Sequence, residues 1–426
     1  MKRELLRWSL LVMLTRGEAF MKFLADRKQL DREAWLLLLI SGLFAASTAL
    51  SNTFVNVYLW KINSRFALIG WFNLISYVAM AAAFVVAGRL AKRVDRVVVV
   101  RVGVALQAVF YLSVLILGRE SAEHVTLLGV FMGIGSGFYW LAFNLLYFEI
   151  TERDNRDIFN GVNGLLVSAA GIAAPMLSGW IIKRVDQLTG YRIIFSFSLG
   201  IFLLAVLISF LLKRRRASGE YRLTDILRLG VRRGTRWYWV SLAMVAQGAR
   251  EGIFAFLIGL LVYIAAKDEW VLGNFLAISS LVSLVTFYLV GRFMRPDWRD
   301  ESVLLGSLMM GLVGLPILWE LNTWTLFVLG VGAALFSPLY LIPLTSMAFD
   351  VIGESRETAR FRVEFVVARE LSLNVGRISS LLLFLWWVER APSPEQLRWL
   401  VLVVGFVPVF TWLAIRHLPL PEGKRR

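Results

Sequence analysis

The sequence predicts an all-α membrane protein in which twelve transmembrane helices form two pseudo-symmetric halves of six. Three observations support this fold class: a high apolar content, twelve long apolar segments, and a correspondence between the two halves of the chain. Of the 426 residues, 58% are hydrophobic, and the mean hydropathy is +0.67. Because these values exceed those of an ordinary soluble domain, we interpret the apolar segments as membrane spans.

Each predicted span is long enough to cross a bilayer as a helix, which takes about 20 apolar residues. The segments are residues 34–60, 68–88, 97–118, 125–150, 159–182, 192–212, 237–266, 270–292, 302–319, 324–349, 363–388 and 396–417. The longest polar interruption is strongly basic and separates six spans from six. The predicted organisation is an N-terminal amphipathic segment (1–33), a six-helix half (34–212), a cytoplasmic linker (213–236), a second half (237–417) and a tail (418–426).

The charged residues are distributed unevenly between the loops. The chain has 46 Lys and Arg against 30 Asp and Glu, a formal net charge of +16. Most of the basic residues lie in the terminal segments and in the alternate loops on their side, so the positive-inside rule predicts that both termini are cytoplasmic. The excess of basic residues then reflects membrane topology and contact with anionic lipid and does not indicate a nucleic-acid partner. We expect a monomer in a bacterial cytoplasmic membrane.

The composition also bears on cofactors and chemistry. There is no Cys, so a disulfide or a thiolate metal site is impossible. The two His residues, His124 and His417, lie in separate peripheral places, and we expect neither a metal nor a cofactor. The outer loops are short, and the first of them lacks Asp and Glu, which disfavours a membrane-embedded enzyme acting on lipid-linked substrates. Residues 3–30 are interpreted either as an amphipathic helix on the membrane surface or as a solvated extension.

The two halves correspond weakly but in a consistent order. Ala49 and Phe54 in the first span match Ala249 and Phe254 in the seventh. A Gly-x-Gly in the fourth span has a counterpart in the tenth, at a similar offset. Parallel repeats of six spans place a binding site near the middle of the membrane, between the halves.

A family motif is recognisable in the loop after the second span, which reads GRLAKRVDRV. Together with the twelve spans, the cytoplasmic termini and the basic linker, this loop resembles the major facilitator superfamily of secondary transporters, whose pattern is G-x-L-A-D-R-x-G-R-[RK]. Gly88, Arg93 and Arg96 match the pattern. Lys92 stands where the family has Asp, and Asp95 is a candidate replacement. The resemblance implies that this loop helps to lock a cytoplasmic gate.

The resemblance covers residues 34–417 and extends to the fifth span, AGIAAPMLSGW. Antiporters of the superfamily have G-x-x-x-G-P-x-x-G-G there, and this chain keeps Pro175, Gly179 and small residues at the other positions. Small residues allow close helix contact, which predicts a helix interface or, as an alternative, ordinary packing. The pattern favours export. The Arg that many drug:proton antiporters carry in the fourth span is replaced by Gly129, which weakens a transfer of their proton-coupling scheme.

Charged residues at mid-depth occur only in the second half. Arg250 and Glu251 are adjacent in the seventh span, and Arg377 lies in the eleventh. Charges at this depth are costly and indicate function. Neighbours on a helix point about 100° apart, so Arg250 and Glu251 need other partners. Glu251 and Arg377 each lie about 20 Å into their spans at 1.5 Å per residue, which predicts a pair, either proton-coupling or structural.

The remaining partners follow from that pairing. We expect Arg250 to reach Glu370, a substrate anion or a carbonyl group. Near the cytoplasmic end, we predict a gate network. It comprises Glu149, Arg153, Asp350, Arg356, Arg369 and Glu370.

The pathway itself is predicted from polar and aromatic residues, because the resemblance implies that spans 1, 4, 7 and 10 face it. Aromatic rings can stack on sugars, amphiphiles or cations. The residues expected to line the cavity are Asn52, Asn56, Tyr139, Trp140, Asn144 and Tyr340.

The sequence thus predicts a secondary active transporter that works by alternating access. The favoured function is proton-coupled export of an amphipathic or lipophilic small molecule. Two alternatives stay open: proton-coupled uptake of a polar or anionic solute such as a sugar, and the flipping of a lipid or glycolipid.

Overall fold

The computed structural model describes residues 30–151, 155–185, 187–214, 220–353, 361–390 and 393–418. Within these ranges the chain is helical without strands. Twelve of its helices are long and apolar enough to span a membrane, which confirms the predicted fold class. The expected amphipathic N-terminal segment and the tail fall almost entirely outside the described residues and stay predictions.

The first half contains six spanning helices. They are α2 (Arg32–Ile62), α3 (Phe66–Arg93), α4 (Arg96–Leu117), α5 (Val125–Ile150), α6 (Arg156–Arg184) and α7 (Gln187–Ser209), with a 3-10 turn, η2 (Gly118–Ala122), after α4. Side chains fix where some of these helices begin: Asp31 accepts a hydrogen bond from the Ala34 amide at the start of α2, and Asp95 accepts one from the Val97 amide at the start of α4. Such caps satisfy backbone groups that a helix leaves unpaired.

The second half follows a short amphipathic helix, α8 (Leu223–Val231), within the basic linker. Its helices are α9 (Arg236–Ala266), α10 (Glu269–Phe293), α11 (Arg299–Leu312), α12 (Thr323–Ile352), α14 (Arg362–Arg390), α15 (Pro394–Phe406) and α16 (Pro408–Arg416), with 3-10 turns η3 (Pro296–Trp298) and η4 (Leu315–Leu318). The last span is divided between α15 and α16 at Pro408, because proline has no amide hydrogen to continue a helix.

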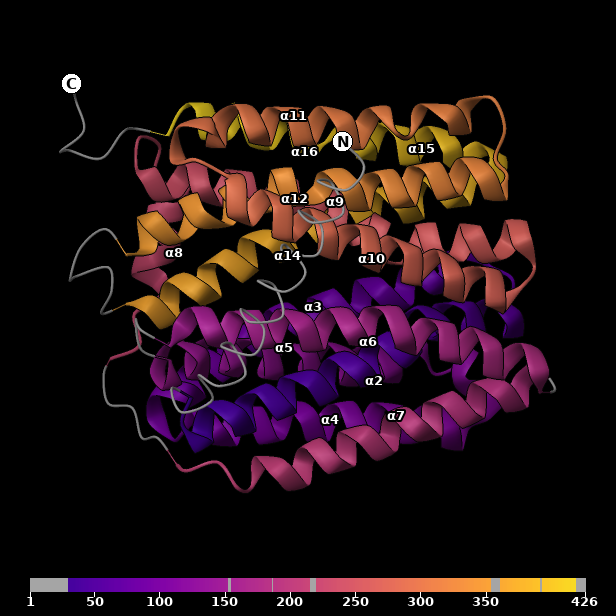
Figure 1. Cartoon of the computed structure of the whole chain (residues 1–426), viewed down its shortest axis with the longest axis horizontal. Helices are drawn as coiled ribbons and strands as arrows, with labels where there is room; N and C mark the ends of the chain where they lie inside the picture. The colour runs from indigo at the N-terminus through magenta and orange to yellow at the C-terminus, as the bar shows by residue number, and fades with distance from the viewer. Residues whose placement is uncertain are drawn as a thin grey trace, which may run out of the picture.

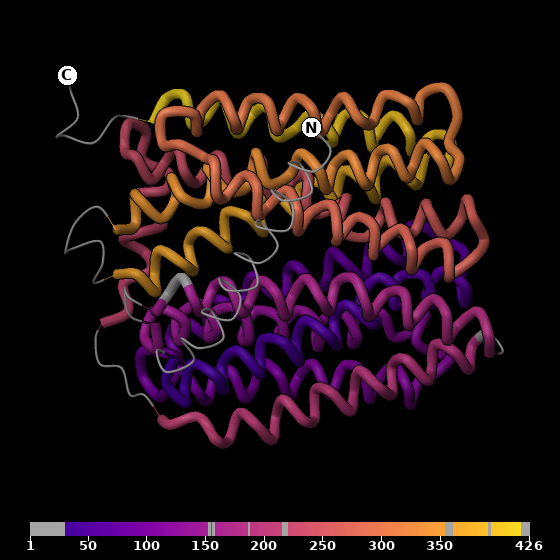
Figure 2. Tube along the Cα trace, viewed as in Figure 1, coloured from indigo at the N-terminus to yellow at the C-terminus, as the bar shows by residue number. Residues whose placement is uncertain are grey.

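The two halves lie side by side along the bundle (Figures 1 and 2). The indigo-to-magenta half holds α2–α7, and the orange-to-yellow half holds α9–α16. Helix α8 lies at one end of the bundle, against α14 and α9. We call this end the α8 side, which the charge distribution predicts to be cytoplasmic, and the other end the far side.

Two helix pairs make most of the contact between the halves: α3 with α14, and α6 with α10. Glycines permit both approaches. A Cβ on Gly70 would lie 2.7 Å from Leu385, and one on Gly88 would lie 2.9 Å from Val367. Helix α3 is therefore packed against α14 near both of its ends.

The α6–α10 pair is close only toward the far side. A Cβ on Gly179 would strike the backbone of Glu269, and one on Gly273 would strike the backbone of Pro175. Pro175 and Gly179 thus lie at a helix interface, where the small-residue pattern of the fifth span predicts one.

Candidate functional site: a charged centre between the halves

The charged centre forms where α9 and α14 approach most closely. A Cβ on Gly252 would lie 2.6 Å from the carbonyl oxygen of Arg377, and one on Gly248 would overlap the backbone of Leu373. Because the glycines bring the two backbones together, the side chain of Glu251 meets that of Arg377 near the middle of both helices.

Arg377 is held between two carboxylates. Its Nη2 donates to Oε2 of Glu251 at 2.7 Å, and its Nε donates to the same oxygen at 3.2 Å. Its Nη1 lies 3.7 Å from Oε2 of Glu370. Gln247 donates to the second oxygen of Glu251 at 2.6 Å. The pairing of Glu251 with Arg377, expected from their equal depths, is present in the structure.

The first half also contacts this centre. The guanidinium of Arg377 lies over the ring of Tyr77 on α3, 5.3 Å from its centroid, at a cation–π distance. Of the two carboxylates, Glu251 keeps 32% of its side chain exposed and Glu370 only 11%. Glu251 is therefore the more accessible proton acceptor.

Arg250 has no such partner. Within the described ranges no carboxylate forms an ion pair with it, and its Nε is buried without a hydrogen-bond acceptor. The guanidinium stacks on Phe254, 4.3 Å from the ring centroid. The expected contact with Glu370 is wrong. Glu370 lies about two helical turns from Arg377 on the same face of α14 and turns toward it.

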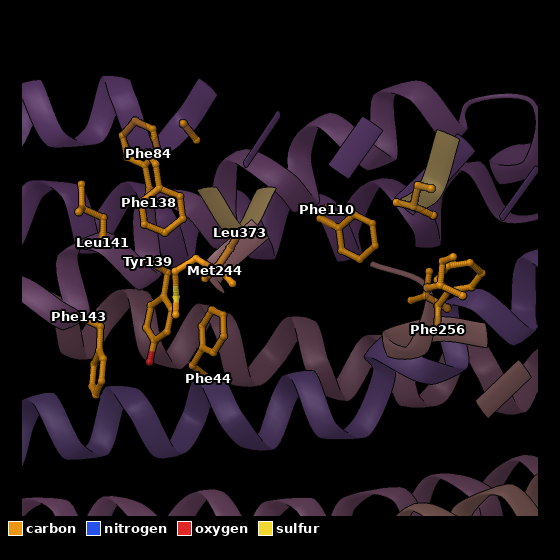
Figure 3. Packing of buried hydrophobic residues seen from close by; sticks show 14 of the residues in the cluster. Phe44, Phe84, Phe110, Phe138, Tyr139, Leu141, Phe143, Met244, Phe256 and Leu373 are labelled. Carbon is orange, nitrogen blue, oxygen red and sulfur yellow. The ribbon is translucent and has the colours of Figure 1, made fainter. Parts of the chain in front are cut away.

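Three of the residues expected to line the cavity are instead packed inside the helix bundle. Asn56 is 4% exposed and accepts a hydrogen bond from Asn73. Tyr139 is 1% exposed and stacks on Phe44, with ring centroids 3.5 Å apart (Figure 3). Tyr340 is 3% exposed and hydrogen-bonds Thr411 at 2.8 Å. For these three the prediction of cavity lining is wrong, because close helix packing satisfies their rings and polar atoms.

Of the other three residues of that set, Asn52 and Trp140 are exposed and Asn144 is half-buried. Asn144 lines a cavity of about 440 Å³ on the α8 side, between α5, α6, α12 and the start of α14. Asn160 and Asn163 of α6 belong to this cavity and to the larger one beside it.

That larger cavity, of about 1080 Å³, opens between α6 and α10 where these helices diverge toward the α8 side. Its described lining is uncharged and combines hydroxyl and amide groups with apolar side chains. The lining residues are Asn160, Gly161, Asn163, Gly164, Leu165, Val167, Ser168, Gly171, Leu276, Ser279, Ser280, Ser283, Leu284, Phe287, Tyr288, Ala334 and Ser337. We call it the α6–α10 cavity.

The GRLAKRVDRV loop joins the halves on the α8 side through a buried ion pair. Lys92 pairs with Glu364 in the first turn of α14 and donates to the Glu220 carbonyl at 2.9 Å. Glu364 is fully buried and also accepts from the Arg222 amide at 3.1 Å. Burial beside Glu364 raises the pKa of Tyr221 above its usual value. The Lys that replaces the family Asp thus has an acid facing it across the halves.

Two other residues of this loop have partners within the first half. Asp95 caps α4, as described above, and Arg96 pairs with Glu149 at the end of α5. Arg93 is exposed. The contact of the loop with α14 is therefore made by Lys92 and by Gly88, at which a Cβ would also lie 2.7 Å from the hydroxyl of Tyr221.

The predicted gate network is only partly described, and its four described members make the following contacts. Asp350 pairs with Arg299 of its own half at 2.8 Å. Arg369 lies over the ring of Phe349, 5.5 Å from its centroid. Glu370 belongs to the charged centre, and Glu149 is held by Arg96. The last two members, Arg153 and Arg356, lie outside the described residues.

Ion pairs on the far side also join the halves, and they were not anticipated. Lys61 at the end of α2 pairs with Glu269, and Lys183 at the end of α6 pairs with Asp268 at 2.5 Å. Burial alone would raise the pKa of Asp268. Hydrogen bonds from Lys183 and from the Trp270 amide outweigh this effect and lower the pKa overall. The sequence does carry a signal for these pairs: two acidic residues stand at the start of the eighth span, and the first and fifth spans end on the same side with basic residues.

The Lys92–Glu364 pair gives a prediction about coupling between the halves. Lys92→Glu places two carboxylates together in a buried site, and removing one partner of a buried pair costs about 3–5 kcal/mol. We expect a lower thermal midpoint of the purified protein and slower transport. The exchanged variant Lys92→Glu/Glu364→Lys should recover most of both losses.

A matched control is Arg299→Glu, because its partner Asp350 is 62% exposed and exposed pairs contribute at most about 1 kcal/mol. Equal effects of the buried and exposed reversals, or no recovery in the exchanged variant, would contradict the assignment of Lys92–Glu364 as a tie between the halves.

Comparison with known proteins agrees with this architecture. The Major Facilitator Superfamily matches residues 37–361. The chain is 45% identical to the uncharacterized protein YqgE of Bacillus subtilis (strain 168) over 350 residues, 82% of this chain and 81% of that protein. It is also 45% identical over 177 residues to an uncharacterized protein in the sodM 3' region of Geobacillus stearothermophilus, 42% of this chain and 83% of that one.

Among solved structures, a bacterial homologue of the iron transporter ferroportin is similar in two states. The TM-score is 0.64 for the outward-facing state and 0.65 for the inward-facing state, with 16% sequence identity in each. Each match covers 91% of this chain, and 99% and 98% of the other. At this identity the likeness shows a shared fold alone.

Proposed function

Because the chain belongs to the Major Facilitator Superfamily, we propose that this secondary transporter couples the movement of an amphipathic small molecule to protons, in the direction of export. The observation that carries the proposal is the charged centre, in which one guanidinium serves two carboxylates. The solute and the direction are supported by the α6–α10 cavity and by the small residues of α6.

The charge count of this centre favours proton binding. Arg377 is the described cation that ion-pairs with both Glu251 and Glu370, so with both ionised two carboxylates share one guanidinium, while the positive charge of Arg250 stands nearby without pairing with either. An uncompensated charge in a low-dielectric site is costly, and a carboxylate there relieves the cost by taking up a proton. Glu251 is the more exposed of the two, so it is the group we assign to carry the proton.

The α6–α10 cavity supports an amphipathic solute. Its described lining has no charged side chain, and it offers hydroxyl and amide groups beside leucine, valine and aromatic surfaces. Mostly apolar pockets with a few polar groups are typical of small-molecule sites. Leu165, Val167 and Phe287 at its walls are also among the exposed large apolar residues, so the cavity borders the surface that faces lipid.

The contacts between halves support alternating access. Lys92–Glu364 joins the halves on the α8 side, and Lys61–Glu269 with Lys183–Asp268 joins them on the far side. Opening either side of a central site requires that the ties on that side break, and the cost is smaller for Lys183–Asp268, which reaches the surface, than for the buried Lys92–Glu364 pair. Such ties suit two halves that rock about a fixed site.

Iron is not carried over from the structural neighbours. Within the described part of the chain, no three His, Asp or Glu side chains gather as metal ligands, and the sequence has no Cys. Hard or borderline metal ions require several such donors. Iron is therefore not part of the proposed function.

Uptake of an anion together with a proton is the second candidate. The observation that favours it is the unpaired guanidinium of Arg250 at mid-depth. Export by exchange and uptake by co-transport move protons in opposite directions relative to the solute, so a single experiment separates them.

The test uses the purified full-length protein in liposomes that contain a pH-sensitive dye. The solutes share a naphthalene body and carry a sulfonate, phosphate, sulfonamide or glucoside group. We expect the lumen to become alkaline when a transported solute is added, because solute enters in exchange for protons; acidification would instead indicate co-transport. No protein-dependent pH change with any of these solutes would overturn proton coupling.

Blocking the α6–α10 cavity tests its assignment as the site of the apolar body. A Cβ on Gly164 meets no atom within 4 Å, so Gly164→Phe should fold and fill cavity space. We expect its transport rate to fall about tenfold or more, the effect of losing roughly 1.4 kcal/mol of binding.

Gly200→Phe on α7 is the matched control, since Gly200 is equally free of neighbours but lies outside the cavity lining. Its transport should equal that of the unchanged protein. Equal rates for the two variants would contradict the role given to the cavity.

A further inference from the structure

We propose that the guanidinium of Arg250 binds the anionic group of the transported molecule, which makes the substrate an amphipathic organic anion. This inference rests on the proposed transport function and adds the chemical class of its substrate. It starts from the contrast between the two arginines at mid-depth. Arg377 has two carboxylates, whereas Arg250 has none in the described ranges.

The protein itself does not satisfy Arg250. Its sequence neighbour Glu251 turns to Arg377, and so does Glu370. No carbonyl accepts from Arg250 among the described residues, and its Nε is shielded from solvent without an acceptor. The rest of the guanidinium is partly accessible, and an arginine at this depth without a carboxylate partner in the described ranges points to an anion that arrives from outside.

The surroundings of Arg250 present its guanidinium for such a ligand. The ring of Phe254 covers one face of the guanidinium at 4.3 Å, which holds the plane in place and leaves its edge free to donate. Planar, fork-like donation matches carboxylate, sulfonate and phosphate groups. The side chain is partly exposed, so an anion can reach it.

A hydroxyl group on α12, another helix of the second half, lies near Arg250. The phenol of Tyr340 on α12 is within electrostatic range of Arg250. It is anchored by the hydrogen bond to Thr411 at 2.8 Å, and Thr411 in turn donates to the carbonyl of Ala243 on α9. These hydrogen bonds join α12, α16 and α9, the last at Ala243, about two helical turns before Arg250.

Helix α12 also connects Arg250 with the α6–α10 cavity. Ser337 lines that cavity, and it lies one helical turn before Tyr340, so their side chains are neighbours on the helix surface. A molecule with its apolar body in the cavity would therefore direct its other end toward Arg250. The uncharged cavity lining and the lone cation together select an anionic head on an apolar body.

The experiment compares two probes of nearly equal shape, naphthalenesulfonate and its neutral sulfonamide, for binding to the purified full-length protein by thermal stabilisation. We expect the sulfonate to bind about tenfold or more tightly, as one charge-assisted hydrogen bond provides. Arg250→Gln should remove this preference. Arg250→Lys should keep part of it, because the charge stays while the fork is lost.

Arg369→Gln is the matched control. Arg369 is a second arginine of this half whose Nε is buried without an acceptor and whose guanidinium lies over a phenylalanine ring, but it lies nearer the α8 side. It should keep the preference for the sulfonate. If Arg250→Gln does not fold, the unchanged protein and Arg250→Lys still decide the question.

Equal binding of both probes to the unchanged protein would overturn the inference, and so would an unaltered preference in Arg250→Gln. Either result leaves proton coupling intact, because that is read from proton movement in liposomes. Conversely, a sulfonate preference that depends on Arg250 would stand even if no proton moved.

Discussion

Glu251→Gln is expected to abolish proton movement in liposomes while the protein stays folded. The substitution removes the group that takes up the proton and keeps the shape of the side chain. It also leaves Arg377 with one carboxylate, Glu370, so that each member of the remaining pair has one partner of opposite charge. The measurement is the solute-driven pH change inside the liposomes, read beside solute flux with a labelled probe.

Two further measurements sharpen this result. The thermal midpoint of Glu251→Gln should stay close to that of the unchanged protein, because the remaining pair is balanced. Glu370→Gln should retain more proton movement, since Glu251, with 32% of its side chain exposed, is the carboxylate that reaches water. Full solute-driven proton movement in Glu251→Gln would sink the assignment of Glu251 and leave the pair as a structural one.

The parts of the fold that sequence reasoning could predict are those set by one-dimensional rules. Span length follows from bilayer thickness, and the boundaries of α2, α5 and α9 follow from where apolar runs end. The Glu251–Arg377 pair could be predicted from the sequence for the same reason. Equal rise along two helices that start on one side places both residues at one depth.

The contacts that sequence reasoning missed depend on which helices are neighbours and how side chains turn. Lys92 and Glu364 are far apart in the chain, and no local pattern links a basic loop residue to the first turn of a later helix. The loss of the family Asp was visible, but its partner could be identified only once α3 was seen to lie on α14.

Burial could not be predicted from residue type. Tyr139 and Trp140 are adjacent aromatics on α5, yet one is 1% and the other 42% exposed. The difference arises because the backbone of α5 at Tyr139 lies against α4, where a Cβ on Gly103 would contact it, and the ring of Tyr139 stacks on Phe44 of α2 (Figure 3). Aromatic residue type alone therefore cannot predict which side chains line a cavity, because helix packing decides which of them are buried.

Arg377→Gln is expected to cause a large loss of stability. It leaves Glu251 and Glu370 close together at mid-depth with no cation between them, and removing one partner of a buried pair costs about 3–5 kcal/mol. The ring of Tyr77 also loses its cation, which loosens the contact between α3 and α14. The thermal midpoint of the purified protein should fall markedly, whereas that of Arg299→Gln, with its exposed partner, should barely change.

Rescue distinguishes the charge effect from a simple loss of packing. If uncompensated carboxylate charge causes the instability, Arg377→Gln/Glu251→Gln should be more stable than Arg377→Gln alone, because one carboxylate is then removed from the site. The two substitutions would show a coupling energy of about 0.5–3 kcal/mol, as contacting residues do. Additive losses would mean that the guanidinium acts mainly by filling space, and the proton site would then have to be sought away from Glu251 and Arg377.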